Sequence, residues 1–271
     1  APLRLHTLYR GDTGDLARRR EALPPAPRGR AYLNLSSTHD GIGLTWLAGL
    51  LPEASLRSLI DEATSRGALV SSRRPTAKGD ELPWEINATW FSACGGASPA
   101  EQVARLLATQ SVVLALRGVP ALYLSLLVAG ANDHARVRET GDNRAINRGR
   151  FDVAAWERAV ADERSVEART LAGMTRLLRA RRSCAAFHPE GAQRILNAGD
   201  SVLAIERTPP GHAPGGPASV VCVASFSGRP VLARLHSGAG ARRDLITRET
   251  GAWGDELELA PFQMRWLAGS R

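Results

Sequence analysis

A histidine and an aspartate stand side by side at positions 39 and 40, after a short apolar stretch and directly before Gly-Ile-Gly. The apolar stretch, residues 31–35, has the character of a strand in a parallel sheet. Such strands present polar groups at their carboxyl ends, where ligands bind in α/β folds. We therefore predict that His39 and Asp40 form one side of a functional site. The alternative interpretation is a strand-end histidine that is capped by its neighbour.

The segments around this pair alternate between strand-like and helical patterns. A helix is predicted after Pro52, with apolar residues at helical spacing and an end at Gly67, and a second from Ser98 to Gly118. A buried strand is predicted at 119–124, and further helices at 14–22 and 165–183. Residues 71–83 and 130–148 are interpreted as long polar loops. This βα alternation predicts a parallel sheet or barrel, followed from about Gln193 by a small antiparallel β domain.

Composition excludes several other classes of protein. The net charge is +8, yet Lys78 is the only lysine and the arginines are scattered, so we expect most of them on solvated helix faces and no nucleic-acid binding. The apolar stretch 111–131 is interrupted in the middle by Arg117, Gly118 and Pro120, which argues against a membrane span. Neither the three cysteines nor the histidines have metal-ligand spacing, and a reducing cytoplasm is predicted.

Seven stretches, in this order along the chain, resemble the sucrose phosphorylase branch of the α-amylase superfamily, glycoside hydrolase family 13. They are LHTLYRGD, STHDGIG, WEINATWFSA, LALRGVPALYL, NDHARVRETGDNRAINR, LRARRSCAAFHPEGAQRIL and LAPFQMRWL. The resemblance implies an α/β fold: an incomplete TIM (β/α)8 barrel, represented by its last two strands and helices, then a C-terminal antiparallel β-sandwich domain. The implied domains are residues 1–185, the C-terminal part of the catalytic barrel, and 186–271, the small all-β domain. The resemblance also implies that the first six barrel strands are missing, so the sequence is expected to be the carboxyl-terminal part of a longer enzyme.

The resemblance also implies roles for individual residues. Asp40 is similar to the carboxylate that stabilises the transition state by gripping the sugar hydroxyls, and His39 to its neighbour in that task. The nucleophile and the acid/base residue of the family lie in segments that this sequence lacks. Three residues, Arg144, Trp84 and Glu85, match positions that line the substrate site, with a surface ion pair as the alternative for Arg144. Asp133 is a further candidate for substrate binding, and a turn-forming role is its equal alternative. Arg73 and Arg74 lie in a segment that matches the loop on the acceptor and phosphate side. Arg148 is interpreted as structural.

The implied function is that of a glycoside phosphorylase, of the sucrose or glucosylglycerate type. Such an enzyme transfers an α-glucosyl group to phosphate with retention and yields α-glucose 1-phosphate. No cofactor and no metal is expected, with inorganic phosphate as co-substrate. The expected partners are a small α-glucoside, phosphate and the missing N-terminal barrel half, with a homodimer as a further candidate, and these 271 residues alone are expected to be inactive. Two alternatives remain: a non-catalytic carbohydrate-binding or scaffold protein, and a family 13 hydrolase or transglycosylase.

Overall fold

The computed structural model describes residues 1–73, 81–211, 219–235 and 241–269. Contacts within the chain divide it into two compact units. Unit 1 comprises Ala1–Tyr9, Leu35–Leu106 and Leu122–Leu171, and unit 2 comprises Arg10–Asn34, Leu107–Ala121 and Ala172–Arg271. The predicted boundary between residues 185 and 186 refers to the parent barrel and stays a prediction.

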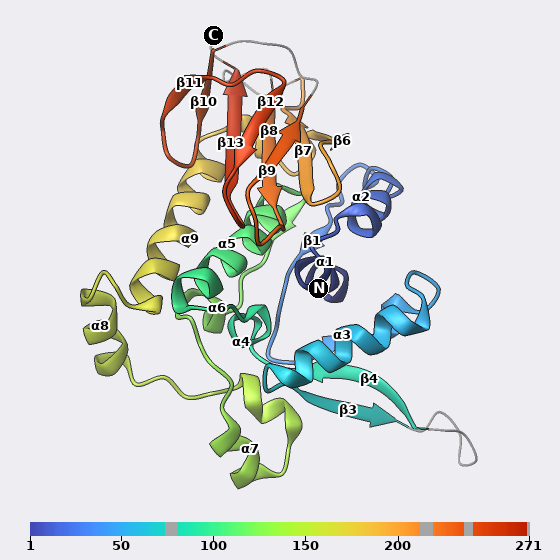
Figure 1. Ribbon diagram of the computed structural model, residues 1–271, viewed down its shortest axis with the longest axis vertical. Helices are drawn as coiled ribbons and strands as arrows, with labels where there is room; N and C mark the ends of the chain where they lie inside the picture. The colour runs from blue at the N-terminus through green and yellow to red at the C-terminus, as the bar shows by residue number, and fades with distance from the viewer. Residues whose placement is uncertain (74–80, 212–218, 236–240, 270–271) are drawn as a thin grey trace. The chain divides into compact units, whose positions relative to one another are not determined.

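The elements are mostly helical in unit 1 and mostly extended in unit 2 (Figure 1). Unit 1 contains α1 (Pro2–Arg10, whose last residue begins unit 2), β2 (Ile42–Gly43), η1 (Thr45–Leu47), α3 (Glu53–Ser65), β3 (Leu69–Arg73), β4 (Leu82–Asn87), α4 (Trp90–Cys94), α6 (Leu124–Leu127), α7 (His134–Thr140), η2 (Asn143–Asn147) and α8 (Val153–Ala161). Two long helices pass from unit 1 into unit 2, namely α5 (Pro99–Ala115) and α9 (Val166–Arg182). Unit 2 contains α2 (Gly14–Glu21), β1 (Leu33–Asn34), β5 (Val119–Pro120), η3 (Ala185–Phe187), β6 (Ala192–Asn197), β7 (Val202–Thr208), β8 (Val220–Ser225), β9 (Val231–Arg234), β10 (Ala241–Asp244), β11 (Thr250–Ala252), β12 (Glu256–Leu259) and β13 (Met264–Gly269).

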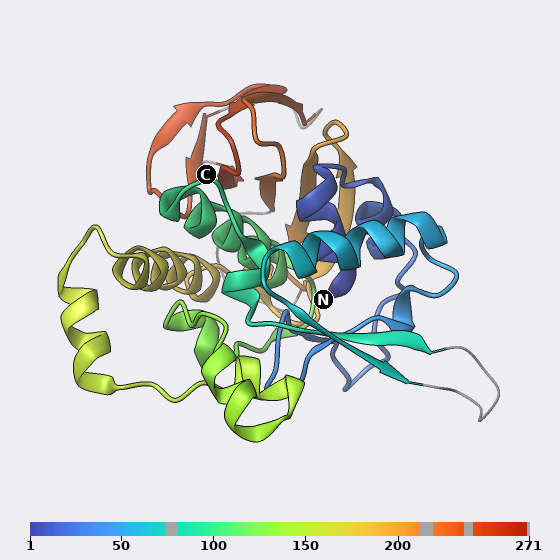
Figure 2. The ribbon, with the colours of Figure 1, turned by 60° about the horizontal axis from the view of Figure 1, so that its bottom comes forward.

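Unit 1 is built around a three-stranded antiparallel sheet in the order β2-β4-β3. Helix α3 lies across this sheet (Figure 2) and buries Leu59 and Ala63, which are four positions apart and so share one helix face. The helix starts after Pro52 and stops before Gly67, as predicted. Within the described residues, no helix of either unit is long and apolar enough to cross a membrane.

Two predictions for unit 1 were wrong. The segment 71–83 was expected to be a loop, but both of its ends are strands, because β3 extends to Arg73 and β4 starts at Leu82. The middle of this segment, residues 74–80, lies outside the described residues. Trp84 and Glu85 lie on β4. Strand β3 is hard to recognise in the sequence because it ends in two serines and an arginine. Its first three positions, Leu69 to Ser71, are half buried and the last two are exposed. The segment 130–148 was also expected to be a loop, but it forms α7 and η2.

The two predicted parallel strands are present in unit 2 and are shorter than expected. Strands β1 and β5 pair in parallel, with Leu33 opposite Val119 and Asn34 opposite Pro120. Gly118 precedes this pairing with φ +112°, and a side chain there would collide with the Tyr32 carbonyl oxygen that the Val119 amide binds. Only glycine lets the chain come this close.

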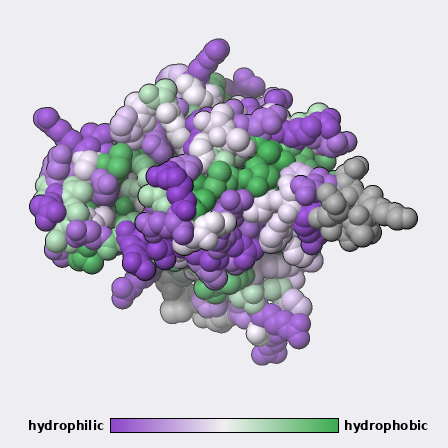
Figure 3. Space-filling model, turned by 90° about the horizontal axis from the view of Figure 1, so that it is seen from below, coloured by the Kyte–Doolittle hydropathy of each residue, from purple (hydrophilic) through white to green (hydrophobic). Residues whose placement is uncertain are grey.

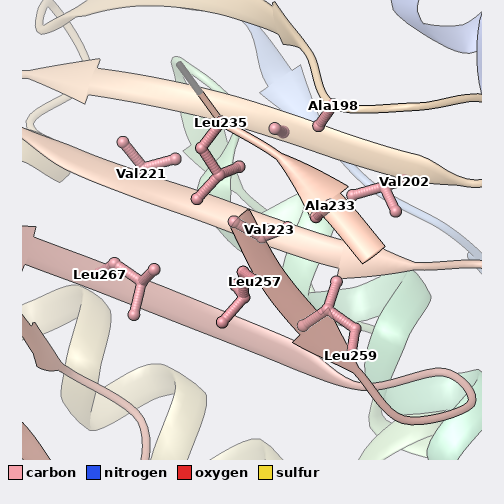
Figure 4. Packing of buried hydrophobic residues seen from close by; sticks show 10 residues of the cluster. Ala198, Val202, Val221, Val223, Ala233, Leu235, Leu257, Leu259 and Leu267 are labelled. Carbon is pink, nitrogen blue, oxygen red and sulfur yellow. The ribbon is translucent and has the colours of Figure 1, made fainter. Parts of the chain in front are cut away.

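The predicted antiparallel β domain is confirmed in unit 2. Its six-stranded sheet has the order β11-β10-β13-β8-β7-β6, and the antiparallel pair β12-β9 packs on it. Alternate side chains of β12, Leu257 and Leu259, are buried, as expected for a strand with one face on a core. They meet Val221, Val223 and Leu267 of the larger sheet in the apolar cluster of Figure 4. Each such side chain contributes roughly 1.5–3 kcal/mol by leaving water.

Arg207 of unit 2 departs from the expected solvated positions. The Arg207 side chain is fully buried and donates hydrogen bonds to the carbonyl oxygens of Ala115, His188 and Ala192 at 2.8, 2.9 and 3.1 Å. Burial is the main cause that lowers the pKa of Arg207 to about 10. This guanidinium therefore fastens the segment before β6 to the end of α5. The face drawn in Figure 3 carries apolar as well as hydrophilic side chains. Exposed apolar side chains of the chain include Trp46, Leu33 and Leu124.

Candidate functional site

His39 and Asp40 lie in a turn of unit 1 that follows β1 along the chain. The Asp40 amide donates to Thr38 Oγ1 at 3.1 Å, which closes the turn. The side chains of His39 and Asp40 are 67% and 41% exposed, so neither is turned into the core. His39 Nε2 lies 3.6 Å from Asp40 Oδ1, which keeps the imidazole and the carboxylate beside each other. The predicted pair is therefore presented to solvent as a unit.

Residues at the end of η2 hold this turn by its backbone. Asn147, which is buried, donates from Nδ2 to the carbonyl oxygens of Asp40 at 2.7 Å and Thr38 at 3.3 Å. Arg148 donates from Nε to the His39 carbonyl oxygen at 2.8 Å. Because three hydrogen bonds fix consecutive carbonyls, the turn presents its side chains in a defined direction. Neither Asn147 nor the backbone role of Arg148 was found in the sequence.

Two guanidinium groups face the Asp40 carboxylate. Arg144 Nη1 lies 3.0 Å and Arg148 Nη2 3.4 Å from Asp40 Oδ1. Arg148 also lies 3.4 Å from Asp142 Oδ2, so an acidic residue next to η2 steadies it. Arg144 was predicted to be at the site, and the structure brings it to Asp40. Arg148 was interpreted as structural, and it contacts both the backbone of the turn, at the His39 carbonyl oxygen, and the Asp40 carboxylate. Its position four residues after Arg144 was the signal in the sequence that could have placed it beside Asp40.

Glu85 and Trp84 reach the same place from β4. The Glu85 side chain is only 4% exposed and accepts two hydrogen bonds from Arg144, from Nε at 2.9 Å and Nη2 at 3.0 Å. The Arg144 guanidinium carbon also lies 5.4 Å from the centre of the Trp84 ring, within the range of a cation–π contact. The hydrogen bonds to Glu85, and then the nearby carboxylates, raise the pKa of Arg144. Arg144 thus joins a buried carboxylate to the exposed one of Asp40.

Gly41 explains why a glycine follows the His-Asp pair. A Cβ atom built on Gly41 would come within 2.7 Å of Glu85 Cδ and of the Ile86 carbonyl oxygen. Strand β2 pairs with β4 here, with Gly43 opposite Glu85. The missing side chain leaves the space that the buried Glu85 carboxylate fills. Gly41 therefore serves the packing of Glu85 against the turn.

The remaining predicted residues are not joined to this cluster by the described contacts. Asp133 is the N-cap residue of α7, and its side chain accepts a hydrogen bond from the Arg136 amide at 2.8 Å. Arg73, at the end of β3, lines a mainly apolar cavity of about 210 Å³ together with Trp84 and Leu82. Arg74 lies outside the described residues. The substrate and acceptor roles of Asp133, Arg73 and Arg74 stay predictions.

The arrangement favours binding over nucleophilic attack. Glu85 is buried and its carboxylate is bound by Arg144, whereas Asp40 and His39 expose an acceptor and a ring nitrogen that can form hydrogen bonds with hydroxyl groups. The described residues contain no group of three or more His, Cys, Asp or Glu that could hold a metal ion. Cys94, Cys184 and Cys222 are buried and form no disulfide.

The chain is similar in sequence to several glycoside phosphorylases. The chain is 32% identical over 269 residues to the glucosylglycerate phosphorylase of Escherichia coli K12, covering 98% of this chain and 46% of that protein. It is 28% identical over 171 residues to the sucrose phosphorylase of Streptococcus mutans, covering 63% of this chain and 33% of that protein. No protein-family model matches the chain.

A solved structure agrees in fold. The crystal structure of sucrose 6F-phosphate phosphorylase from Thermoanaerobacter thermosaccharolyticum aligns with a TM-score of 0.65 and 22% identity, over 95% of this chain and 46% of that one. The chain thus spans just under half the length of the glucosylglycerate phosphorylase and of this solved chain. It has an α/β fold with a C-terminal antiparallel sheet domain. The chain is a homologue of the glucosylglycerate and sucrose phosphorylases and corresponds to their carboxyl-terminal portion.

Proposed function

We propose that this chain is the carboxyl-terminal part of a retaining glucoside phosphorylase. In this proposal the whole protein transfers an α-glucosyl group from an α-glucoside, of the glucosylglycerate or sucrose kind, to inorganic phosphate. The product is α-glucose 1-phosphate, and no cofactor takes part. The names of the relatives support the reaction class, and the exposed Asp40 carboxylate in its rigid turn is the observation that carries it.

Within this proposal the Asp40 and His39 side chains bind hydroxyl groups of the glucosyl ring. The oxocarbenium-like transition state flattens the ring and builds positive charge on it. A carboxylate that is already fixed binds this state more tightly than the ground state, because its orientation is set before the reaction. Arg144 and Arg148 keep Oδ1 of Asp40 in place at 3.0 and 3.4 Å, which leaves Oδ2 for the sugar.

In the same proposal β1 and β5 are the last two strands of a TIM barrel whose other strands belong to the preceding part of the protein. The support is their parallel pairing, and the exposed Leu33 and Val119 side chains on them. Such strands need further strands or helices to cover them. The preceding segments would supply the nucleophile and the acid/base residue, so the 271 residues alone are expected not to turn over substrate. The buried free thiols of the three cysteines fit a cytoplasmic enzyme.

The test is the phosphate dependence of turnover by the protein that the whole coding sequence specifies. Glucosylglycerate and sucrose are each supplied with and without inorganic phosphate, and glucose 1-phosphate and free glucose are measured separately. A phosphorylase releases glucose 1-phosphate in proportion to phosphate, with little free glucose. Free glucose released at the same rate without phosphate would favour a hydrolase, and no turnover of any α-glucoside would favour a carbohydrate-binding protein.

A further inference from the structure

A second cleft lies in unit 2, and none of its residues belongs to the Asp40 cluster. It has a volume of about 450 Å³, within the range of small-molecule sites. Its walls come from the segment before β1, from the turn between α5 and β5, and from the turn after η3. The lining includes Pro25, Pro27, Arg28, Arg30, Arg117 and Glu190.

The walls of this cleft are fixed by hydrogen bonds. The Pro24 carbonyl oxygen accepts from Arg117 Nη2 at 2.7 Å and from the Tyr32 hydroxyl at 3.0 Å. The Arg117 amide donates to Gln193 Oε1 at 2.8 Å, which ties the α5–β5 turn to β6. The Arg30 amide donates to the Pro27 carbonyl oxygen at 3.0 Å, which closes a turn that Pro27 also stiffens. The cleft therefore exists before a ligand arrives, and less ordering is needed for binding.

Charge in this cleft is unbalanced. Three arginines face one glutamate, which leaves an excess of two positive charges. Across the residues that the structure describes, Arg28, Arg30 and Glu190 form no ion pair. Arg117 hydrogen-bonds through its guanidinium to the neutral carbonyl oxygens of Leu23 and Pro24, so its charge is not compensated there. A concave site with unpaired guanidiniums attracts anions and can bind phosphate with paired donors.

A second observation points to the same excess of positive charge. Arg207 lies in the same unit, and it donates to the His188 carbonyl oxygen, next to the cleft residues Pro189 and Glu190. After burial, which is the largest cause, the nearby guanidiniums of Arg181 and Arg117 contribute to the lowered pKa of Arg207. The positive charge of Arg117 therefore disfavours the charged form of the buried Arg207.

Size and polarity define the ligand further. A bare phosphate ion would leave most of about 450 Å³ unfilled, so the ligand has a body attached to its anionic group. Pro25, Ala26, Pro27 and Pro189 offer apolar wall to such a body. The unpaired Glu190 carboxylate, which is exposed, accepts hydrogen bonds from hydroxyl groups. An excess of two positive charges matches a phosphate monoester, which carries close to two negative charges at neutral pH.

We propose that the cleft formed by residues 25–30, Arg117 and Glu190 binds a sugar phosphate, with the phosphate group on Arg28, Arg30 and Arg117 and sugar hydroxyls on Glu190. This proposal does not rest on the reaction proposed above, because it concerns a different set of residues in the other unit.

The test is calorimetric titration of the whole protein carrying Asp40→Asn, a substitution that weakens ligand binding at Asp40. The ligands are glucose 1-phosphate, glucose 6-phosphate, inorganic phosphate and glucose. The test variant adds Arg28→Ala and Arg30→Ala. The matched control adds Arg57→Ala and Arg194→Ala, which removes the same charge from exposed positions elsewhere. We expect at least one sugar phosphate to bind, and the Arg28/Arg30 variant to bind it at least about tenfold more weakly, since each charge-assisted hydrogen bond is worth roughly that factor or more. The control variant is expected to bind within about threefold of its parent.

A Glu190→Gln variant checks the hydroxyl contact, because it keeps the shape and removes the charge. We expect this variant to bind sugar phosphates more weakly, while its binding of inorganic phosphate changes less. The proposal is overturned if no sugar phosphate binds, if the Arg28/Arg30 variant binds as well as its control, or if glucose or inorganic phosphate binds as tightly as the sugar phosphates.

Discussion

Replacing Arg144 with methionine tests the link between the buried and the exposed carboxylate. Methionine keeps most of the apolar length of the side chain and removes every donor. Glu85, 4% exposed, then loses both of its hydrogen bonds of 2.9 and 3.0 Å. Hydrogen bonds to charged groups contribute about 1.5–3 kcal/mol each, and breaking a buried ion pair costs about 3–5 kcal/mol. Because Arg144 itself is 32% exposed, water replaces part of what is lost, and we expect unfolding free energy to fall by about 2–3 kcal/mol.

Urea denaturation followed by circular dichroism measures this loss, and hydrogen exchange of the β3 and β4 amides localises it to unit 1. The matched control is Arg136→Met on α7, where the arginine is 31% exposed and its partner Glu139 is 65% exposed. An exposed pair is worth little, so the control is expected to lose about 1 kcal/mol or less. Adding Glu85→Gln to Arg144→Met removes the unpaired buried charge and should restore part of the stability. If Arg144→Met lowers the unfolding free energy no more than its control does, the Arg144–Glu85 pair does not offset the burial of Glu85 and the reasoning fails.

Three further predictions concern the same unit. Asn147→Ala leaves the carbonyl oxygens of Thr38 and Asp40 without their side-chain donor and should lower the unfolding free energy by about 1–3 kcal/mol in urea denaturation. Hydrogen exchange at the Asp40 amide should become faster, and an unchanged exchange rate would contradict the role of Asn147 in the turn. Gly41→Ala places a Cβ against Glu85 and should cost about 1–3 kcal/mol of unfolding free energy in urea denaturation, and an unchanged unfolding free energy would be the opposing result. Burial is the main cause that raises the pKa of Tyr9, whose hydroxyl donates to the Ala93 carbonyl oxygen at 2.7 Å, so its stabilising contribution is complete below pH 10 and is lost as pH rises beyond that value. In a titration followed by tyrosinate absorbance, the difference between wild type and Tyr9→Phe should therefore appear above pH 10 in the folded protein, and a difference centred at pH 10 would contradict the burial.

The sequence predicted those parts of the fold whose signals are local. Helix α3 has Pro52 before it and Gly67 after it, and the strands of unit 2 are apolar runs between Gly and Pro turns. Strand β3 was missed because Ser71, Ser72 and Arg73 lack the apolar alternation of a half-buried strand. Helix α7 carried an overlooked local signal, since Asp133 caps its start and Gly141, with φ +69°, ends it.

For the site, the sequence predicted the members better than their connections. His39 and Asp40 were recognised from their place after a strand, and Arg144 and Glu85 from the resemblance. That Arg144 binds Glu85, 59 positions away, depends on how β4 and η2 meet, which no local pattern encodes. The contribution of Asn147 was hidden for the same reason, because its partners Thr38 and Asp40 lie more than one hundred positions earlier.

The most direct measurement of the central claim is turnover by an Asp40→Asn variant of the whole protein. Asparagine keeps the shape and the backbone hydrogen bonds of the turn but removes the negative charge that would stabilise the oxocarbenium-like ring. We expect kcat for release of glucose 1-phosphate to fall by roughly a thousandfold or more, with the far-UV circular dichroism spectrum unchanged. A correctly folded Asp40→Asn protein that keeps a kcat within a few-fold of the wild-type value would contradict the assignment of Asp40 to the transition state.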